Sequence, residues 1–257
     1  IPISCCSALS SLSSSNPKGT VIVVGASGGT GLRALTGFLD VGWKPEQLRV
    51  LTRSADKMVA LQEAGFSTAQ ADLDVPLSEQ LKAAVSGCVG CYIHSTSSDT
   101  KKLDTAEVDR ARNLAAAIAA TGDIENIVYN SAVGEVGHGV YRIKQKHWVE
   151  QVFRNSNFTS LRANLFMEEL WKEYTRPSIL KGNYPFSLPS DRQIYLTSVR
   201  DMGRLAGTIL QTTPSQSNTI ISVASDVPTP VQMADAFAKA QGSPCVHKSS
   251  RIFGLIV

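Results

Sequence analysis

Short apolar runs alternate with segments of helical periodicity along most of this chain, and this alternation is the feature that most restricts its fold. A parallel strand needs a crossover, usually a helix, before the next parallel strand, so the pattern predicts a parallel sheet with helices on both faces, an α/β fold. The predicted strands are Thr20–Val24, Leu48–Thr52, Thr68–Ala71, Val89–Ile93, Ile127–Asn130, Thr159–Arg162 and Thr219–Val223. The predicted helices contain Leu32, Leu35, Phe38 and Leu39, and span Ala55–Ala64, Leu77–Val85, Ala106–Ala120, Tyr141–Arg154, Val199–Gln211 and Val231–Ala240.

A glycine-rich turn joins the first predicted strand to the first predicted helix. Glycines stand three residues apart, and such a turn lets the backbone bend sharply and approach a pyrophosphate. The N–H groups at the start of the helix then bind the phosphate oxygens. The turn therefore predicts a Rossmann-type, doubly wound fold that binds a dinucleotide, with a purely structural turn as the alternative. The predicted contacts of the turn with the cofactor are Gly25, Ser27, Gly28, Gly29, Thr30 and Gly31.

The end of the second predicted strand favours NADP(H) over NAD. NAD sites usually carry an acid there, whereas this chain has Arg53, with Lys57 one turn later. A guanidinium suits the 2′-phosphate through bidentate, charge-assisted hydrogen bonds; ordinary solvated charges are the alternative. Asp72 is placed to accept a hydrogen bond from the adenine, or to cap a helix. Leu73 and Ser95, which follow the third and fourth strands, complete the predicted cofactor contacts.

Several segments together resemble the atypical short-chain dehydrogenase/reductases, in particular their NmrA-like, NAD(P)H-binding branch. The resemblance runs from about Thr20 to Gly242 and implies either an NADPH-dependent reductase or a protein that binds the cofactor without turnover. The second class includes redox sensors and plastid assembly factors. The segments that carry the resemblance are Val24–Gly31, Leu51–Ser54, Ala71–Asp74, Val128–Ala132, Lys146–Glu150 and Phe158–Glu168.

Reduction of a carbonyl by NADPH needs a proton donor beside the hydride acceptor. Short-chain dehydrogenases use a Tyr and a Lys four residues apart on one helix face, and a Ser after the fifth strand. Ser131, Tyr141 and Lys146 are the predicted catalytic residues. Lys146 follows Tyr141 by five residues, about 140° around a helix, so the pair departs from the standard spacing. The alternatives are a packing role for Tyr141 and a solvated ion pair of Lys146 with Glu150; His94 is a minor acid–base candidate.

The segment after the sixth predicted strand supplies the predicted substrate contacts, Asn164, Phe166 and Met167, as part of an apolar pocket wall. An apolar segment simply folded over the sheet is the alternative. We expect an NADPH-dependent oxidoreductase acting on a small apolar substrate, with a non-catalytic NADPH-binding sensor or assembly factor as the second hypothesis. An NAD-using sugar-nucleotide epimerase fits less well, because it needs an intact Tyr–Lys pair and usually an acid where Arg53 stands.

The chain divides into three predicted parts. Residues 1–17 are Ser-rich and lack periodicity, which predicts a disordered segment or the remnant of a targeting peptide. Residues 18–163 form the predicted NAD(P)-binding Rossmann domain. Residues 164–257 form a smaller, substrate-binding C-terminal portion, with truncation left open. The Ser-rich start is compatible with the plastid stroma as well as the cytoplasm.

Composition restricts the partners. A net charge of +3 gives no argument for nucleic acid, and no apolar run reaches the roughly 18 residues of a membrane span. Five cysteines do not indicate a disulfide framework. Cys88 and Cys91 form a C-x-x-C that we interpret as part of a buried strand, so no metal is predicted. The predicted partner is a small-molecule substrate or, under the second hypothesis, a protein; the sequence leaves the oligomeric state open.

Overall fold

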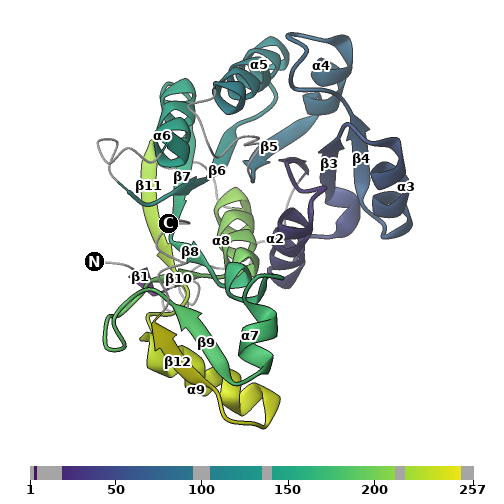
Figure 1. Cartoon of the computed structure of the whole chain (residues 1–257). Coiled ribbons are helices and arrows are strands. Elements are labelled where there is room, and N and C mark those ends of the chain that lie inside the picture. The colour runs from purple at the N-terminus through teal and green to yellow at the C-terminus, as the bar shows by residue number, and fades with distance from the viewer. Residues whose placement is uncertain (1–2, 5–18, 95–104, 135–140, 212–217, 250–257) are drawn as a thin grey trace. The chain divides into compact units, whose positions relative to one another are not determined.

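The computed structural model describes residues 3–4, 19–94, 105–134, 141–211 and 218–249 (Figure 1). The chain forms two compact units: unit 1 contains Ile1–Ala163 and Val199–Val223, and unit 2 contains Asn164–Ser198 and Ala224–Val257. Unit 1 thus includes 199–223 in addition to the predicted domain 18–163. Apart from the short strand β1 (Ile3–Ser4), the predicted disordered or targeting segment 1–17 lies outside the described residues.

Unit 1 is built on one large sheet with the strand order β1-β11-β7-β6-β5-β2-β3-β4. The seven strands from β11 to β4 pair in parallel, and the strand order reverses between β2 and β5, where doubly wound sheets bind their ligands. These strands are β2 (Thr20–Val24), β3 (Leu48–Thr52), β4 (Ser67–Gln70), β5 (Cys88–Ile93), β6 (Asn126–Ala132), β7 (Phe158–Ala163) and β11 (Thr219–Ala224).

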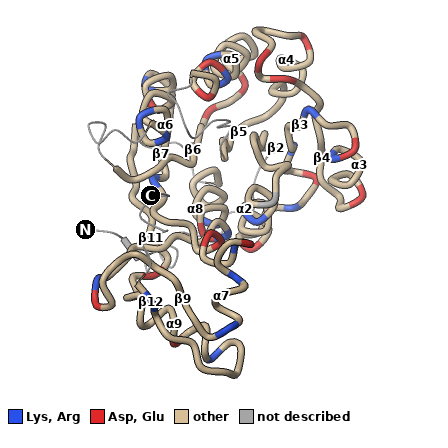
Figure 2. Tube along the Cα trace, in the orientation of Figure 1, with Lys and Arg blue, Asp and Glu red and all other residues tan. Residues whose placement is uncertain are grey.

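Helices cover both faces of the sheet. On one face, α4 (Glu79–Val85), α5 (Ala106–Thr121) and α6 (Tyr141–Val152) pack on a continuous apolar cluster. On the other face, α2 (Gly29–Asp40) lies against α8 (Val199–Gln211), and Phe38 of α2 contacts Tyr92 of β5. Helix α3 (Ala55–Glu63) packs on β3 and β4, and a 3-10 turn, η1 (Pro45–Gln47), precedes β3. Figure 2 shows charged residues gathered on helices and loops, whereas β2, β5 and β6 carry none.

The predicted α/β fold is confirmed, and most element boundaries lie close to the predicted ones. Helix α4 begins at Glu79 instead of Leu77, because Ser78 caps it by accepting a hydrogen bond from Leu81 N–H, while Leu77 takes a positive φ of 47°. Strand β6 continues to Ala132, so Ser131 lies within the strand. Cys88 and Cys91 are free and buried in β5.

Unit 2 has its own small core of buried apolar residues, centred on Tyr184 and Phe186. Two small parallel pairs of strands are added to it, β8 with β10 and β9 with β12. Its elements are β8 (Leu165–Phe166), η2 (Met167–Trp171), α7 (Arg176–Leu180), β9 (Asn183–Phe186), β10 (Leu196–Thr197), α9 (Pro230–Gln241) and β12 (Val246–Ser249). Among the described residues, none of the helices has the length and apolar character needed to cross a membrane.

Candidate nucleotide and catalytic site

The glycine turn between β2 and α2 has the geometry of a phosphate-binding loop. Gly25 has a φ of 79°, a conformation that side chains rarely allow. A Cβ on Gly31 would lie 2.3 Å from Cα of Ala26, so only glycine lets the helix start this close to the turn. Helix α2 has Gly28 as its N-cap, has no side-chain cap hydrogen bond, and carries no acid in its first turn. Its positive N-terminal end is therefore left for an anion.

A pocket of about 170 Å³ joins this turn to the ends of β3 and β4. It is smaller than the roughly 300–1,000 Å³ of sites that enclose a whole ligand. Several predicted cofactor contacts come together here, and Arg110 of α5, which the sequence reasoning missed, joins them. The lining residues are Val24, Gly25, Ser27, Leu51, Thr52, Arg53, Ala71, Asp72, Leu73 and Arg110.

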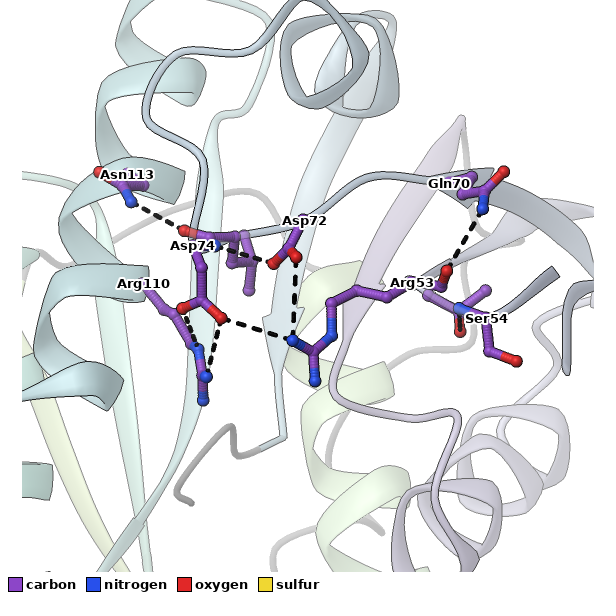
Figure 3. A network of polar contacts seen from close by, with 9 residues as sticks. Arg53, Ser54, Gln70, Asp72, Asp74, Arg110 and Asn113 are labelled. Carbon is purple, nitrogen blue, oxygen red and sulfur yellow. Dashed lines mark hydrogen bonds and ion pairs between the residues drawn. The ribbon is translucent and has the colours of Figure 1, made fainter. Parts of the chain in front are cut away.

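A network of charges organises the edge of this pocket (Figure 3). Arg110 donates two hydrogen bonds to Asp74, at 2.7 Å and 3.0 Å, and these are the main cause of a lowered pKa at Asp74. Arg53 Nη1 lies 3.4 Å from Asp74 Oδ2 and 3.8 Å from Asp72 Oδ2. Asp72 also accepts a hydrogen bond from the backbone N–H of Asp74 within the loop after β4; the N-cap of the next helix, α4, is Ser78, so Asp72 does not cap a helix. Lys57 lies in the first turn of α3, where its backbone N–H donates to Ser54.

Lys146 lies in a second, mostly buried cluster between α5, α6 and β6. Its Nζ donates to Glu107 Oε1 at 3.2 Å and lies 3.5 Å from the hydroxyl oxygen of Tyr129. Tyr129 also donates to Glu107, at 3.1 Å. Burial, reinforced by Glu107, raises the pKa of Tyr129 well above its ordinary value. The side chain of Lys146 is 15% exposed and that of Glu107 is 3% exposed.

Glu150 belongs to a different network from Lys146. Its carboxylate accepts hydrogen bonds from Ser131, Ser160 and Arg162, at 2.6–3.0 Å. Burial raises the pKa of Glu150, but the bonds from these three donors outweigh burial and lower it. The solvated Lys146–Glu150 ion pair considered from the sequence is therefore not formed: both side chains are largely buried, and each bonds a different partner.

The predicted residues Ser131 and Tyr141 lie in contrasting surroundings. Ser131 is 1% exposed and donates its hydroxyl hydrogen to Glu150. Tyr141 is the first residue of α6 and is 45% exposed. The structure thus places a lysine beside a tyrosine, but the tyrosine is Tyr129 of β6, whose identity no helix spacing could indicate.

His94 directly follows β5, at the ligand-binding edge of the sheet. It is buried, and its Nδ1 lies 3.3 Å from the hydroxyl oxygen of Tyr92 and 3.3 Å from Nδ2 of Asn130. Burial, with a smaller contribution from the charge of Lys146, lowers the pKa of His94 to about 4. The imidazole is therefore neutral near pH 7. Ser95, the next predicted cofactor contact, lies outside the described residues.

The three predicted substrate contacts belong to unit 2. The backbone N–H of Asn164 donates to the Thr197 hydroxyl, and Phe166 lies in β8. Met167 lines an apolar pocket of about 540 Å³. The pocket includes a stacked pair, Trp171 of η2 and Phe237 of α9, with ring centroids 5.9 Å apart. In the described part of the chain, no group of three or more His, Cys, Asp or Glu side chains is arranged to hold a metal.

Three solved structures show the same fold. The chain is 19% identical to the triphenylmethane reductase of Citrobacter sp. complexed with NADP(H), with a TM-score of 0.74, covering 90% of this chain and 79% of that one. It is 18% identical to an NADPH-dependent quinone oxidoreductase of Escherichia coli complexed with NADPH, with a TM-score of 0.71 and coverage of 90% and 78%. It is 18% identical to NmrA, a negative transcriptional regulator in complex with NAD, with a TM-score of 0.71 and coverage of 91% and 75%.

Sequence comparison is decisive at the level of the family. A comparison with curated proteins gave no match. The model of the NmrA-like family, in contrast, matches residues 17–250, nearly the whole chain, which confirms the resemblance seen in the sequence. The chain belongs to the NmrA-like family.

Proposed function

We propose that this chain binds NADP(H), with the pyrophosphate at the glycine turn and the 2′-phosphate at Arg53. The observation that carries the proposal is that Gly25 of the turn and Arg53 at the end of β3 line the same pocket. An arginine in this place suits a phosphate, whereas it lacks the acceptor oxygens with which an acid binds the ribose diol of NAD. The reductase and the oxidoreductase of the same fold, which were solved with NADP(H) and NADPH, support this cofactor.

Calorimetry with purified protein tests the cofactor. We expect NADPH to bind at least about tenfold more tightly than NADH, a difference of about 1.4 kcal/mol. Gly28→Ala is a suitable binding variant, because a Cβ at Gly28 meets no atom of the described residues within 4 Å while it fills space at the N-terminus of α2. It should weaken the binding of both nucleotides, whereas thermal unfolding should shift only by the small cost of alanine at the N-cap. Wild-type protein that binds neither nucleotide, or that prefers NADH, contradicts the proposal.

We further propose that the chain is an NADPH-dependent reductase of a small apolar substrate. NADPH supplies the hydride when bound, and Lys146 is the residue we assign to the substrate oxygen or the nicotinamide ribose. Glu107 and Tyr129 position its ammonium group. We assign Ser131 an indirect role, because its hydroxyl donates to Glu150.

Loss of NADPH absorbance across a panel of quinones, enones and ketones tests turnover. Lys146→Met should abolish turnover while NADPH binding changes less. Lys144→Met is the matched control on the same helix, since Lys144 Nζ lies over the Trp148 ring, 5.2 Å from its centroid, and we assign it no role in the reaction. A Lys146→Met variant with full activity would contradict this role of the lysine.

A cofactor-binding protein without turnover, a redox sensor or an assembly factor, is the second candidate. The observation that favours it is that Ser131 and Tyr141, the two residues that would complete a short-chain dehydrogenase site, lie in surroundings that do not suit catalysis. Ser131 is buried against Glu150, and Tyr141 is 45% exposed at the start of its helix. Tight NADPH binding with no turnover across the whole panel would favour this candidate over the reductase.

A further inference from the structure

Arg110 lines the same pocket as the glycine turn, but it comes from helix α5 and not from a strand end. Its side chain is 16% exposed, so it is held in the wall of the pocket. The loop that follows β4 is fixed to the same helix one turn further on, where Asn113 donates to the Leu73 carbonyl oxygen at 2.7 Å. Helix α5 therefore holds both Arg110 and the loop that carries Asp74 in place.

Asp74 is shared unequally between two guanidinium groups, which approach it from either side (Figure 3). Arg110 binds both carboxylate oxygens, at 2.7 Å and 3.0 Å. Arg53 reaches one oxygen at 3.4 Å and is 64% exposed. Bidentate, charge-assisted pairs are the strong ones, whereas an exposed single contact changes an equilibrium constant by about fivefold at most. The Arg53 contact is therefore the replaceable one.

We infer that Asp74 binds Arg53 in place of the cofactor's 2′-phosphate, and that Arg110 retains Asp74 when the phosphate takes over Arg53. This inference rests on the proposed NADP(H) function and deepens it, because it makes Asp74 and Arg110 determinants of the preference for NADPH. A 2′-phosphate carries more negative charge than a carboxylate and presents three oxygens, so it competes well for an exposed guanidinium.

Arg110 has a distinct role in this exchange. Asp72 and Asp74 place two carboxylates within 4 Å of the Arg53 guanidinium, and an incoming phosphate is repelled by both. The bidentate bond from Arg110 neutralises Asp74 and turns its carboxylate toward α5. Without Arg110, Asp74 would remain a competitor for Arg53 and a source of repulsion. The two residues should therefore have opposite effects on NADPH affinity.

Calorimetry of NADPH and NADH with Asp74→Asn, Arg110→Met and the double variant tests the inference. Asp74→Asn should tighten NADPH by about two- to fivefold and leave NADH within about twofold. Arg110→Met should weaken NADPH by a similar factor. The double variant should return to the affinity of Asp74→Asn if Arg110 influences the phosphate through Asp74, as the inference requires.

Asp109→Asn is the matched control. It removes one negative charge from the residue next to Arg110 on the same helix, where Asp109 pairs with Arg112 at 2.7 Å. NADPH affinity should stay within about twofold of wild type. If this variant tightens NADPH as much as Asp74→Asn does, the effect is one of general charge and the inference fails. Asp74→Ser replaces Asp74→Asn if the latter does not fold.

Three further results would overturn the inference. Weaker NADPH binding by Asp74→Asn would mean that Asp74 orients Arg53 productively. A double variant as weak as Arg110→Met would mean that Arg110 contacts the phosphate itself. Wild-type protein that binds no NADPH would overturn the proposed function together with this inference, whereas the first two results leave the proposed function in place.

Discussion

In unit 1, Asp40 and Asp74 are each paired with two arginines. The two sites differ in the role of the arginines: those at Asp40 join two helices, whereas at Asp74 one of them lines the nucleotide pocket. Asp40 ends α2 and accepts hydrogen bonds from Arg200 and Arg204 of α8, all between 2.6 Å and 2.8 Å. Its side chain is 20% exposed. An acid at the C-terminal end of a helix is unfavourable, so these arginines also offset its interaction with the helix dipole.

Asp74 has the same chemistry in a different setting. Its side chain is 44% exposed, and among the described residues Arg110 alone pairs with it at short distance, while Arg53 lines the pocket and makes a long single contact. Arg200 and Arg204 come from one helix and close on Asp40 together, which suits a permanent link between helices. The guanidiniums at Asp74 come from α5 and the end of β3, which suits a site where one partner is exchanged.

The largest effect should be the loss of NADPH affinity when Arg53 is removed from the site at Asp74. Arg53→Ala should weaken NADPH by about 10- to 100-fold, since hydrogen bonds to charged groups contribute about 1.5–3 kcal/mol. NADH, which lacks the 2′-phosphate, should change by much less. Calorimetry with both nucleotides measures the effect, and urea unfolding serves as the control. An Arg53→Ala variant that unfolds easily but binds NADPH normally would show that Arg53 stabilises the fold and does not bind the cofactor.

The counterpart at the other site is Asp40→Asn, which should reduce the free energy of unfolding by about 1–3 kcal/mol. Three short hydrogen bonds between α2 and α8 lose their charged acceptor, and two guanidiniums remain near a neutral amide. NADPH affinity should not change. Urea unfolding at pH 7 measures the stability, and calorimetry checks the cofactor. Unchanged stability would show that the helices are joined by apolar packing alone.

The contribution of Asp40 should disappear in acid. Hydrogen bonding to Arg200, partly opposed by burial and assisted by Arg204, lowers the pKa of Asp40 from 3.8 to about 2. Because the folded-state pKa lies below the unfolded value, the stabilisation is complete above about pH 4 and is lost as the pH falls toward 2. The difference in unfolding free energy between wild type and Asp40→Asn should therefore shrink over that range. A constant difference down to pH 2 would be evidence against this titration.

The layered fold could be predicted because buried parallel strands are continuous apolar runs, as in Thr20–Val24, and because helices between them keep one apolar face. The short strands of unit 2 were missed. A strand such as Leu165–Phe166 has two residues, too few for any periodicity, and its partner Leu196–Thr197 is about thirty residues away.

The candidate site could be proposed from the sequence only where its residues are local in sequence, and the contacts that folding assembles were missed. The glycine turn and Arg53 follow directly from strand ends. Arg110 meets Asp74 across 36 residues, and Lys146 meets Glu107 across 39. Helical spacing paired Lys146 with Glu150, yet both side chains point into the protein, where tertiary partners replace the neighbour on the helix.

The smallest effect should be the stability change caused by Asp74→Asn. At this site Arg53 is already solvated, so the variant loses mainly the bond from Arg110; because the Asp74 carboxylate is itself 44% exposed, water competes for it and we expect a contribution of about 1 kcal/mol. The free energy of unfolding should fall by about 1 kcal/mol or less, below the loss for Asp40→Asn, when both are measured in urea at pH 7 with equal m-values. The hydrogen bonds from Arg110 also lower the pKa of Asp74, so the stability that Asp74 provides should decline in acid, in the same direction as at Asp40.

If Asp74→Asn destabilises the protein as much as Asp40→Asn, the arginines around Asp74 stabilise the fold as much as those around Asp40. Arg53 could then not exchange its partner at low cost, and the distinction between a permanent link and a replaceable one would be wrong.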